Sequence, residues 1–215
     1  MLHRMTTKTH WEAVYETKAA DAVSWYAPHL NASLQYIHRA APGKDAAIID
    51  VGGGESTLVD DLLAAGYGKL TVLDISATAL EATRQRLGRA GDSVQWIPAD
   101  VLGADLPAAA FDVWHDRAVF HFLTSDEQRQ RYVEQALKAL KPGGFAIVGT
   151  FGPQGPDKCS GLPVARYSAD ELHDAFGEPF ELLDSSVEQH TTPWGTRQQF
   201  VYCFCRRVAS QSHAV

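Results

Sequence analysis

The sequence is poor in cysteine and in long apolar runs, and these two shortages exclude several classes of protein. Its 215 residues include three cysteines, an odd number: Cys159, Cys203 and Cys205. A disulfide framework or structural zinc site is therefore not expected, and a reducing cytoplasm is the predicted location. No apolar run approaches the ~18 residues of a membrane-spanning helix, and the N-terminus lacks the apolar core of a signal peptide.

Positive charge is also scarce. The sequence has 19 Lys and Arg against 26 Asp and Glu, for a formal net charge of −7. Nucleic-acid binding requires clustered Lys and Arg to neutralise phosphates, so neither a nucleic-acid nor a membrane partner is expected. No set of His, Asp and Glu has the spacing of metal ligands, so no metal site is predicted. The length suits one domain, and no feature predicts an oligomeric state.

The most informative segment is AAIIDVGGGES at residues 46–56. A short apolar run typical of a buried strand leads to Asp50 and then to three consecutive glycines, Gly52, Gly53 and Gly54. Apolar residues then recur at helical spacing. A strand, a glycine turn and a helix form the nucleotide site of open α/β sheets, because glycine lets the backbone turn tightly and approach a ligand.

Strands and helices alternate through the middle of the chain. Strands are predicted at residues 46–51, 70–75, 94–98, 111–115 and 145–151. Helices are predicted between them, near residues 57–65, 77–87 and 126–140. Repeated strand–helix units indicate parallel strands with helices on both faces. After a loop and a short capped helix, two long strands near 180–189 and 197–208 form a hairpin, which must add an antiparallel strand.

Four motifs, in this order, resemble those of the class I methyltransferases that use S-adenosylmethionine. They are DVGGG at residues 50–54, LDIS at 73–76, ADV at 99–101 and LKPGG at 140–144. The resemblance covers residues 46–208. It implies an α/β fold with a seven-stranded, mostly parallel, doubly wound sheet whose last strand is antiparallel. It also implies S-adenosylmethionine as cofactor, S-adenosylhomocysteine as product and no metal.

The resemblance gives each motif a role in holding the cofactor. The glycine turn, with Asp50 before it and a helix N-terminus after it, would take the methionine end. Asp74 would accept hydrogen bonds from the ribose hydroxyls, and Asp100 from the adenine amino group. Ile75 and Val101 would enclose the adenine ring. One aspartate after a strand is usually a cap or turn residue, but three at consecutive strand ends indicate a ligand site.

The acceptor side is expected to begin after the fourth strand. Asp116-Arg117-Ala118 resembles the Asp-Arg-Gly of thiopurine-type small-molecule methyltransferases and of some lysine methyltransferases, with alanine replacing glycine. Asp116 is a candidate base, Arg117 would orient an anion, and His121 would transfer a proton, since its usual pKa is about 6.5. The alternative is an Asp–Arg ion pair that braces the sheet edge. His115, on the strand itself, is expected to contact the cofactor.

A helical, aromatic segment at residues 1–42 is predicted to form a lid over the site. It precedes a cofactor-binding half at 43–151, a substrate loop and hairpin at 152–208, and a tail at 209–215. Trp11 of this lid is expected at the cofactor. The predicted acceptor contacts are Tyr15, Trp25, Cys159, His190 and Trp194. Ordinary packing of a helical cap would explain the lid aromatics equally well.

A small acceptor is the preferred hypothesis, because the insertions are short and no Asn/Asp-Pro-Pro-Tyr follows the fourth strand. The Asp-Arg resemblance favours a thiol, a sulfide or a related soft nucleophile, which needs little activation. The alternative is a protein lysine N-methyltransferase, in which Asp116 would receive the ammonium. A NAD-dependent oxidoreductase fits less well, since Thr57 stands where its third glycine belongs, and a non-catalytic cofactor sensor is the remaining hypothesis.

Overall fold

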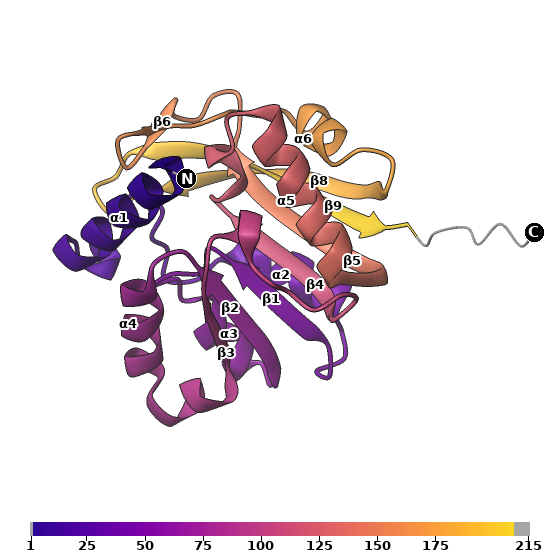
Figure 1. The fold of residues 1–215 in the computed structure, drawn as a ribbon, viewed down its shortest axis with the longest axis horizontal. Helices are drawn as coiled ribbons and strands as arrows, with labels where there is room; N and C mark the ends of the chain where they lie inside the picture. Colours follow the sequence, from indigo (N-terminus) through magenta and orange to yellow (C-terminus); the bar gives the residue numbers. More distant parts are fainter. Residues whose placement is uncertain (1, 209–215) are drawn as a thin grey trace, which may run out of the picture.

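A seven-stranded sheet forms the centre of the computed structural model, which describes residues 2–208, with side chains from residue 7 onward; the predicted tail lies outside this range. The strand order is β3-β2-β1-β4-β5-β9-β8 (Figure 1). The strands are β1 (Ala47–Val51), β2 (Lys69–Asp74), β3 (Gln95–Pro98), β4 (Phe111–Arg117), β5 (Leu140–Phe151), β8 (Phe180–Thr191) and β9 (Arg197–Arg207). β9 runs antiparallel to both β5 and β8, and the other pairs are parallel, which confirms the predicted sheet.

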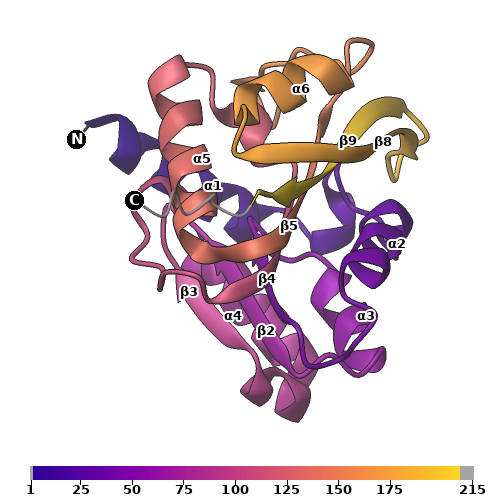
Figure 2. The same cartoon turned by 90° about the vertical axis from the view of Figure 1, so that its right-hand side faces the viewer.

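Helices cover both faces of this sheet. Figure 2 shows α5 on one side of the sheet and α2 and α3 on the other. The helices are α2 (Asn31–Ala40), α3 (Leu58–Ala64), α4 (Ala77–Leu87), α5 (Asp126–Ala139) and α6 (Ala169–Phe176). Each face has its own apolar cluster, one with α5 and α6 and one with α2, α3 and α4. Alternation along β9 divides its side chains between them, because successive residues of a strand point to opposite faces.

Local sequence signals fix several helix starts. Two capping boxes are present, with Ser125 capping α5 and Ser168 capping α6. Ser76 caps α4 by accepting a hydrogen bond from the Ala79 amide at 3.1 Å. A capping hydroxyl satisfies an amide that has no partner within the helix. The predicted loop after β5 also contains a short hairpin, β6 (Lys158–Cys159) with β7 (Leu162–Pro163).

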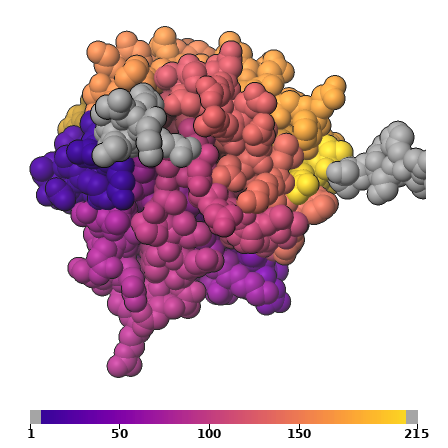
Figure 3. All heavy atoms as spheres, viewed as in Figure 1, coloured from indigo at the N-terminus to yellow at the C-terminus, as the bar shows by residue number. Residues whose placement is uncertain are grey.

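The N-terminal segment divides into two parts. The helix α1 (Leu2–Thr17) lies on the surface against α4 (Figure 3), and a single turn, η1 (Ala20–Ala22), follows it. The helix α2 instead packs against one face of the sheet, because its Ile37 is fully buried in the apolar cluster there. Only the part before α2 therefore covers the strand ends. None of the described helices has the length and apolar composition of a membrane span.

Candidate active site

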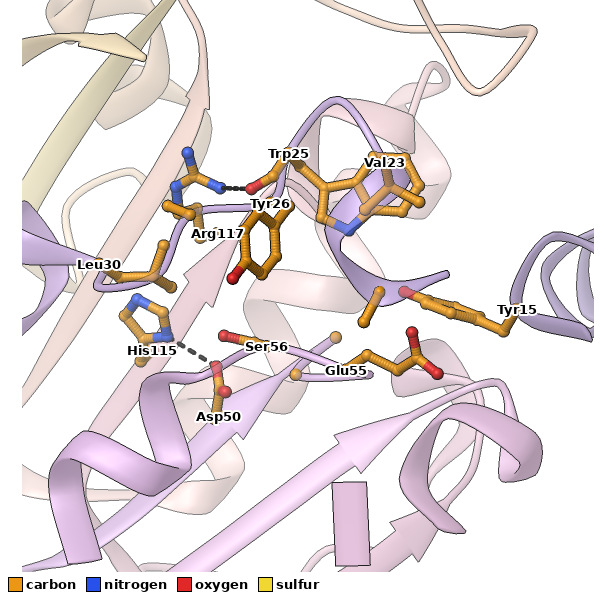
Figure 4. A pocket seen from close by; sticks show the side chains of 14 residues that line it. Tyr15, Val23, Trp25, Tyr26, Leu30, Asp50, Glu55, Ser56, His115 and Arg117 are labelled. Atoms are coloured by element: carbon orange, nitrogen blue, oxygen red, sulfur yellow. Dashed lines mark hydrogen bonds and ion pairs between the residues drawn. The ribbon is translucent and has the colours of Figure 1, made fainter. Parts of the chain in front are cut away.

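A cavity lies at the carboxyl ends of β1 and β4, beneath the segment that joins α1 to α2. Figure 4 shows Arg117 and His115 toward one end of it and Tyr15 and Glu55 toward the other. The structure thus brings together the following predicted site residues: Asp50, Gly52, Gly53, His115, Arg117, Tyr15 and Trp25. This is the edge at which open α/β sheets bind ligands.

The turn after β1 is one that only glycine can form. Gly52 and Gly54 have φ values of +69° and +41°, in the left-handed region that side chains disfavour. A Cβ atom on Gly52 would lie 2.0 Å from a methyl carbon of Val119, and one on Gly53 would lie 2.6 Å from Asp50 Oδ2. The glycines therefore let the turn pack closely against its neighbours and expose its backbone to the cavity.

Two carboxylates flank this turn, Asp74, which also accepts from the Gly54 backbone, and Glu55, which lines the cavity. Asp74, at the end of β2, is buried and accepts a hydrogen bond from the Ser76 amide at 2.8 Å. Burial raises the pKa of Asp74 to about 7. The Oε2 atom of Glu55 is buried and has no hydrogen-bond partner among the described residues. Both side chains fit a ligand that brings hydroxyl or ammonium donors, since carboxylates buried without donors are unfavourable.

The other predicted cofactor contacts do not line the cavity. Asp100 accepts from the Leu102 amide at 2.9 Å and so caps the turn η3 (Val101–Gly103). Val101 packs into the apolar cluster of the α5 face, and Ile75 is half-buried. Trp11 makes edge-to-face contacts with Trp25 and Phe122, at 5.7 and 5.2 Å between ring centres. The roles of Asp100, Ile75 and Val101 at the adenine, and of Trp11 at the cofactor, remain predictions.

Arg117 presents a buried positive charge to the cavity. Its Nη1 donates to the carbonyl of Trp25 at 2.9 Å, and its guanidinium lies 4.2 Å from the ring centre of Phe200. Its Nε is 3.8 Å from a carboxylate oxygen of Glu188, which is too long for a hydrogen bond. The Nε and Nη2 groups have no hydrogen-bond partner among the described residues. The site can therefore donate two hydrogen bonds, with charge, to an anionic group.

Asp116 does not line this cavity. Its carboxylate accepts from the amides of Val119 and Phe120, at 2.8 and 3.1 Å, and from the hydroxyl of Tyr132. Burial raises its pKa to about 6. The Asp116–Arg117 ion pair weighed as an alternative is not formed, because the carboxylate nearest to Arg117 in the described chain is that of Glu188.

His121 is also fully buried outside the cavity. Its ring packs 4.5 Å from that of Phe151, and its Nδ1 accepts from the Phe151 amide at 3.4 Å. Burial, together with the nearby charge of Arg117, lowers the pKa of His121 to about 3. The imidazole is therefore neutral at physiological pH, and its predicted proton transfer would have to use that neutral form.

None of the predicted acceptor contacts beyond β5 lines the cavity. Cys159 is buried, and burial raises the pKa of its thiol to about 12. His190 donates to the carbonyl of Ser24 at 2.8 Å and so holds the lid segment. Trp194 is 60% exposed on the β8–β9 turn. Of the lining residues outside the predicted set, Tyr26 and Glu55 bring a phenol and a carboxylate, and Glu55 directly follows the glycines.

Among the described residues, no group of three or more His, Cys, Asp or Glu side chains could hold a metal ion. The polar groups on the cavity wall are instead a histidine–carboxylate pair, a guanidinium, the Glu55 carboxylate and backbone amides. His115 Nδ1 is 2.7 Å from Asp50 Oδ1 within this set. Such a wall binds an organic ligand through hydrogen bonds and charge.

Comparison with known proteins agrees with this geometry. A family model described as a methyltransferase domain matches residues 48–144. Human EEF1A lysine methyltransferase 2 is 22% identical over 192 residues, which cover 83% of this chain and 75% of the relative. The range matched by the family model runs from the second residue of β1 through β2, β3 and β4, and it includes the glycine turn after β1.

Solved structures share the fold over almost the whole chain. A protein from a study of the conversion of a disulfide bond into a thioacetal group during echinomycin biosynthesis has a TM-score of 0.75. It is 22% identical, and the match covers 96% of this chain and 94% of that one. The Burkholderia thailandensis 1,6-didemethyltoxoflavin-N1-methyltransferase, with its substrate and S-adenosylhomocysteine bound, has a TM-score of 0.72 at 19% identity, covering 96% and 90%.

Proposed function

This chain belongs to the class I S-adenosylmethionine-dependent methyltransferases, and we propose that it methylates a small soft nucleophile held beside Arg117. The observation that carries the proposal is the buried Arg117 guanidinium on the cavity wall, whose Nε and Nη2 groups have no hydrogen-bond partner among the described residues. A fixed positive charge favours an acceptor that is anionic when it reacts, such as a thiolate. Membership of this enzyme family argues against both the nicotinamide-dependent and the non-catalytic hypotheses.

The cofactor would be held at the opposite end of the cavity. Its methionine part fits the glycine turn, where the backbone is exposed, and its ammonium fits the unpartnered carboxylate oxygen of Glu55. Its ribose hydroxyls fit Asp74. When bound, S-adenosylmethionine supplies an electrophilic methyl group on a sulfonium. The task of the chain is then to align the acceptor with that methyl group and to exclude water.

The enclosure of the cavity supports a small acceptor. Trp25 and Tyr26, from the segment after α1, and Leu30 close it on the side away from the glycine turn. The Arg117–Trp25 hydrogen bond ties that segment to the strand end. The toxoflavin-pathway enzyme, of similar fold, is a small-molecule methyltransferase.

Lysine methylation is the second candidate, and the names of the curated relatives favour it over the small acceptor. The relatives include the EEF1A lysine methyltransferase 2 of human and mouse. A lysine acceptor needs a carboxylate for its ammonium, but the unpartnered carboxylate on the cavity wall, that of Glu55, lies at the end proposed for the cofactor ammonium. The charge of Arg117 opposes a lysine acceptor, since a like charge in a buried site is repelled. The local geometry therefore favours the small acceptor.

The test is a transfer assay with the full chain and methyl-labelled S-adenosylmethionine. Alkyl and aromatic thiols are compared with lysine-containing peptides and cell lysate. We expect a labelled methyl thioether, and we expect Arg117→Met to lower kcat/KM by about 100-fold or more, since buried charged contacts have that order of effect. S-adenosylhomocysteine affinity should change little. The control is Arg166→Met at an exposed arginine. Label in protein and none in thiol would establish the lysine alternative instead.

A further inference from the structure

The backbone of the lid is anchored on each side of Tyr26. On one side, Arg117 Nη1 of β4 donates to the carbonyl of Trp25 at 2.9 Å. On the other side, the hydroxyl of Thr57, the residue before α3, donates to the carbonyl of Ala27 at 3.1 Å. Two elements of the scaffold thus hold the residues that flank Tyr26, so the fold sets the place of the Tyr26 side chain.

The phenol of Tyr26 faces the cavity. It belongs to the cavity wall, and Figure 4 shows its hydroxyl directed into the cavity, toward the side where Ser56 and His115 lie. The side chain is half-buried, and its hydroxyl has no hydrogen-bond partner among the described residues. A tyrosine in such a place offers a ligand an apolar ring and one hydroxyl that is free to donate.

His115 is less available to a ligand, although it also lines the cavity. Its Nδ1 is 2.7 Å from Asp50 Oδ1, and its Nε2 is 2.8 Å from Ser33 Oγ. Because both ring nitrogens have partners, a ligand could hydrogen-bond the imidazole only by displacing Asp50 or Ser33. All three side chains are buried, and a buried polar group that loses its partner costs free energy. We therefore expect the acceptor to find its hydrogen bonds elsewhere.

Two donors remain on the part of the wall that lies away from the glycine turn. The indole of Trp25 hydrogen-bonds the Tyr15 hydroxyl. Among the described lining residues, this leaves the Arg117 guanidinium, with two unpartnered nitrogen groups, and the Tyr26 hydroxyl. The other lid side chains that face the cavity are apolar: Ala20, Val23, Ala27 and Leu30. This wall therefore offers one charged donor and one neutral donor within an apolar surface.

Tyr26 belongs to the acceptor end of the cavity rather than to the cofactor end. It directly follows Trp25, whose carbonyl Arg117 holds, whereas Tyr15 and Glu55 lie toward the other end (Figure 4). The methionine part of the cofactor is expected at the glycine turn, on the opposite wall. The Tyr26 hydroxyl is therefore expected to affect the choice of acceptor and to leave cofactor affinity nearly unchanged.

We propose that Tyr26 is a specificity-determining residue, whose hydroxyl donates a hydrogen bond to an oxygen or nitrogen atom close to the reacting sulfur of the acceptor. The inference rests on the proposed function, in which Arg117 holds the sulfur as a thiolate. The wall fits a thiol with a hydrocarbon body and one hydrogen-bond-accepting atom, such as an ether, carbonyl or ring nitrogen. A thiol without that atom would leave the Tyr26 hydroxyl unpaired in a desolvated site, which is unfavourable.

The experiment compares pairs of linear thiols in which an ether oxygen replaces one methylene group. Methoxyethanethiol is paired with butanethiol, and methoxypropanethiol with pentanethiol. We expect Tyr26→Phe to lower kcat/KM for the ether by about 5- to 10-fold in at least one pair, the order of one neutral hydrogen bond. The hydrocarbon partner should lose less than about twofold. Comparing each thiol with itself in the two proteins cancels the difference in thiol pKa within a pair.

Tyr167→Phe is the matched control. The Tyr167 ring packs against Phe120 in the apolar cluster on the α5 face, away from the cavity, so this variant should change neither thiol of a pair relative to the other. Unfolding midpoints and S-adenosylhomocysteine affinity show whether each variant folds and binds, and rates are compared per binding-competent molecule. Both quantities should be nearly unchanged in Tyr26→Phe, because its hydroxyl has no partner among the described residues.

Equal losses with both thiols of each pair, or no loss with any, would overturn the role of Tyr26 and leave the proposed function standing. A loss confined to S-adenosylhomocysteine affinity would also overturn it, since it would place the Tyr26 hydroxyl at the cofactor. A wild-type chain that methylates none of these thiols would overturn the proposed acceptor, and the inference with it.

Discussion

The hydroxyl of Tyr132 donates to Oδ2 of Asp116, while Trp114 Nε1 donates to the same tyrosine oxygen at 2.8 Å. This relationship turns Asp116 toward α5, whereas His115 and Arg117, its neighbours on β4, line the cavity on the other face. Successive strand residues point to opposite faces, so the Asp-Arg pair cannot act on one ligand from the strand itself. The carboxylate instead fixes the turn after β4 by accepting from the Val119 and Phe120 amides.

Asp116→Asn should therefore act mainly on stability. The amide would retain one acceptor oxygen but leave buried donors unpaired, so the free energy of unfolding should fall by about 1–3 kcal/mol. Activity per folded molecule should fall less than tenfold. Denaturant unfolding and initial rates measure the two effects, with Asp92→Asn at an exposed site as control. A variant of normal stability that loses activity by a hundredfold would instead establish Asp116 as a catalytic base.

Much of the fold could be predicted from the sequence because the signals are local. The glycine turn, the Ser125 and Ser168 capping boxes and the alternation in β9 each depend on a few adjacent residues. The face of the sheet to which the Asp116 side chain points was harder to predict from the sequence, since it depends on where β4 ends. The predicted strand stopped at residue 115, but β4 continues to Arg117. The two additional strand residues are Asp116 and Arg117, and because they belong to the strand, their side chains point to opposite faces and only Arg117 lines the cavity.

The buried hydrogen bond between Ser33 and Tyr202 could not be predicted for a different reason. Ser33 and Tyr202 are 169 positions apart in the chain and meet only when α2 packs on β9. Neither belongs to a motif, and a serine in a helix or a tyrosine in a strand is ordinary in sequence. Contacts of this kind depend on tertiary packing, which periodicity does not report. A role for Glu55 in the site, by contrast, could have been predicted from the sequence, because it directly follows the glycines.

Cofactor affinity should depend on pH through Asp74. Burial raises its pKa to about 7, and hydrogen bonds from ribose hydroxyls would favour its ionised form. The affinity for S-adenosylhomocysteine should therefore fall as pH decreases below 7, by up to about tenfold per unit. Calorimetric titrations between pH 5.5 and 8.5 measure this dependence. An unchanged profile in Asp74→Asn would assign the dependence to another group.

The Asp74 carboxyl has the opposite pH dependence in the stability of the cofactor-free protein, to which it contributes more at low pH than at high pH. Its folded pKa is above the unfolded value of about 3.9, so the folded state binds the additional proton between these values. Its contribution is complete below pH 4 and is lost as pH rises through 7. The difference in unfolding free energy between wild type and Asp74→Asn should change over that window. A constant difference from pH 4 to 7 would contradict the raised pKa.

Ala118→Gly should stabilise the fold. Ala118 has φ +74°, a left-handed conformation, at the position where the resembling Asp-Arg-Gly segment has glycine. Relief of this strain, less the greater chain entropy of glycine, should raise the free energy of unfolding by about 0.5–1 kcal/mol. Ala65→Gly is the control, since Ala65 has an ordinary φ of −76° and should give no gain. A loss of stability in Ala118→Gly would show that contacts of the methyl group exceed the strain.

Glu12→Ala should loosen α1 and release the bound cofactor faster. The Glu12 carboxylate accepts from the Ser76 hydroxyl at 2.7 Å and from the Ala77 and Thr78 amides at 3.0 and 3.2 Å. It thus binds the N-terminus of α4, where unpaired amides and the helix dipole favour a negative charge. Loss of this contact, by about 1–2 kcal/mol, should raise the dissociation rate of S-adenosylhomocysteine about 5- to 30-fold.

Stopped-flow tryptophan fluorescence can follow this release, because Trp11 and Trp25 lie in the lid. The matched control is Glu16→Ala, at an exposed glutamate one turn further along α1. Equal dissociation rates in the two variants would mean that aromatic packing, rather than the α4 contact, holds the lid. Because Ser76 also donates its amide to Asp74, a faster release specific to Glu12→Ala would connect the lid to the residue proposed to hold the ribose.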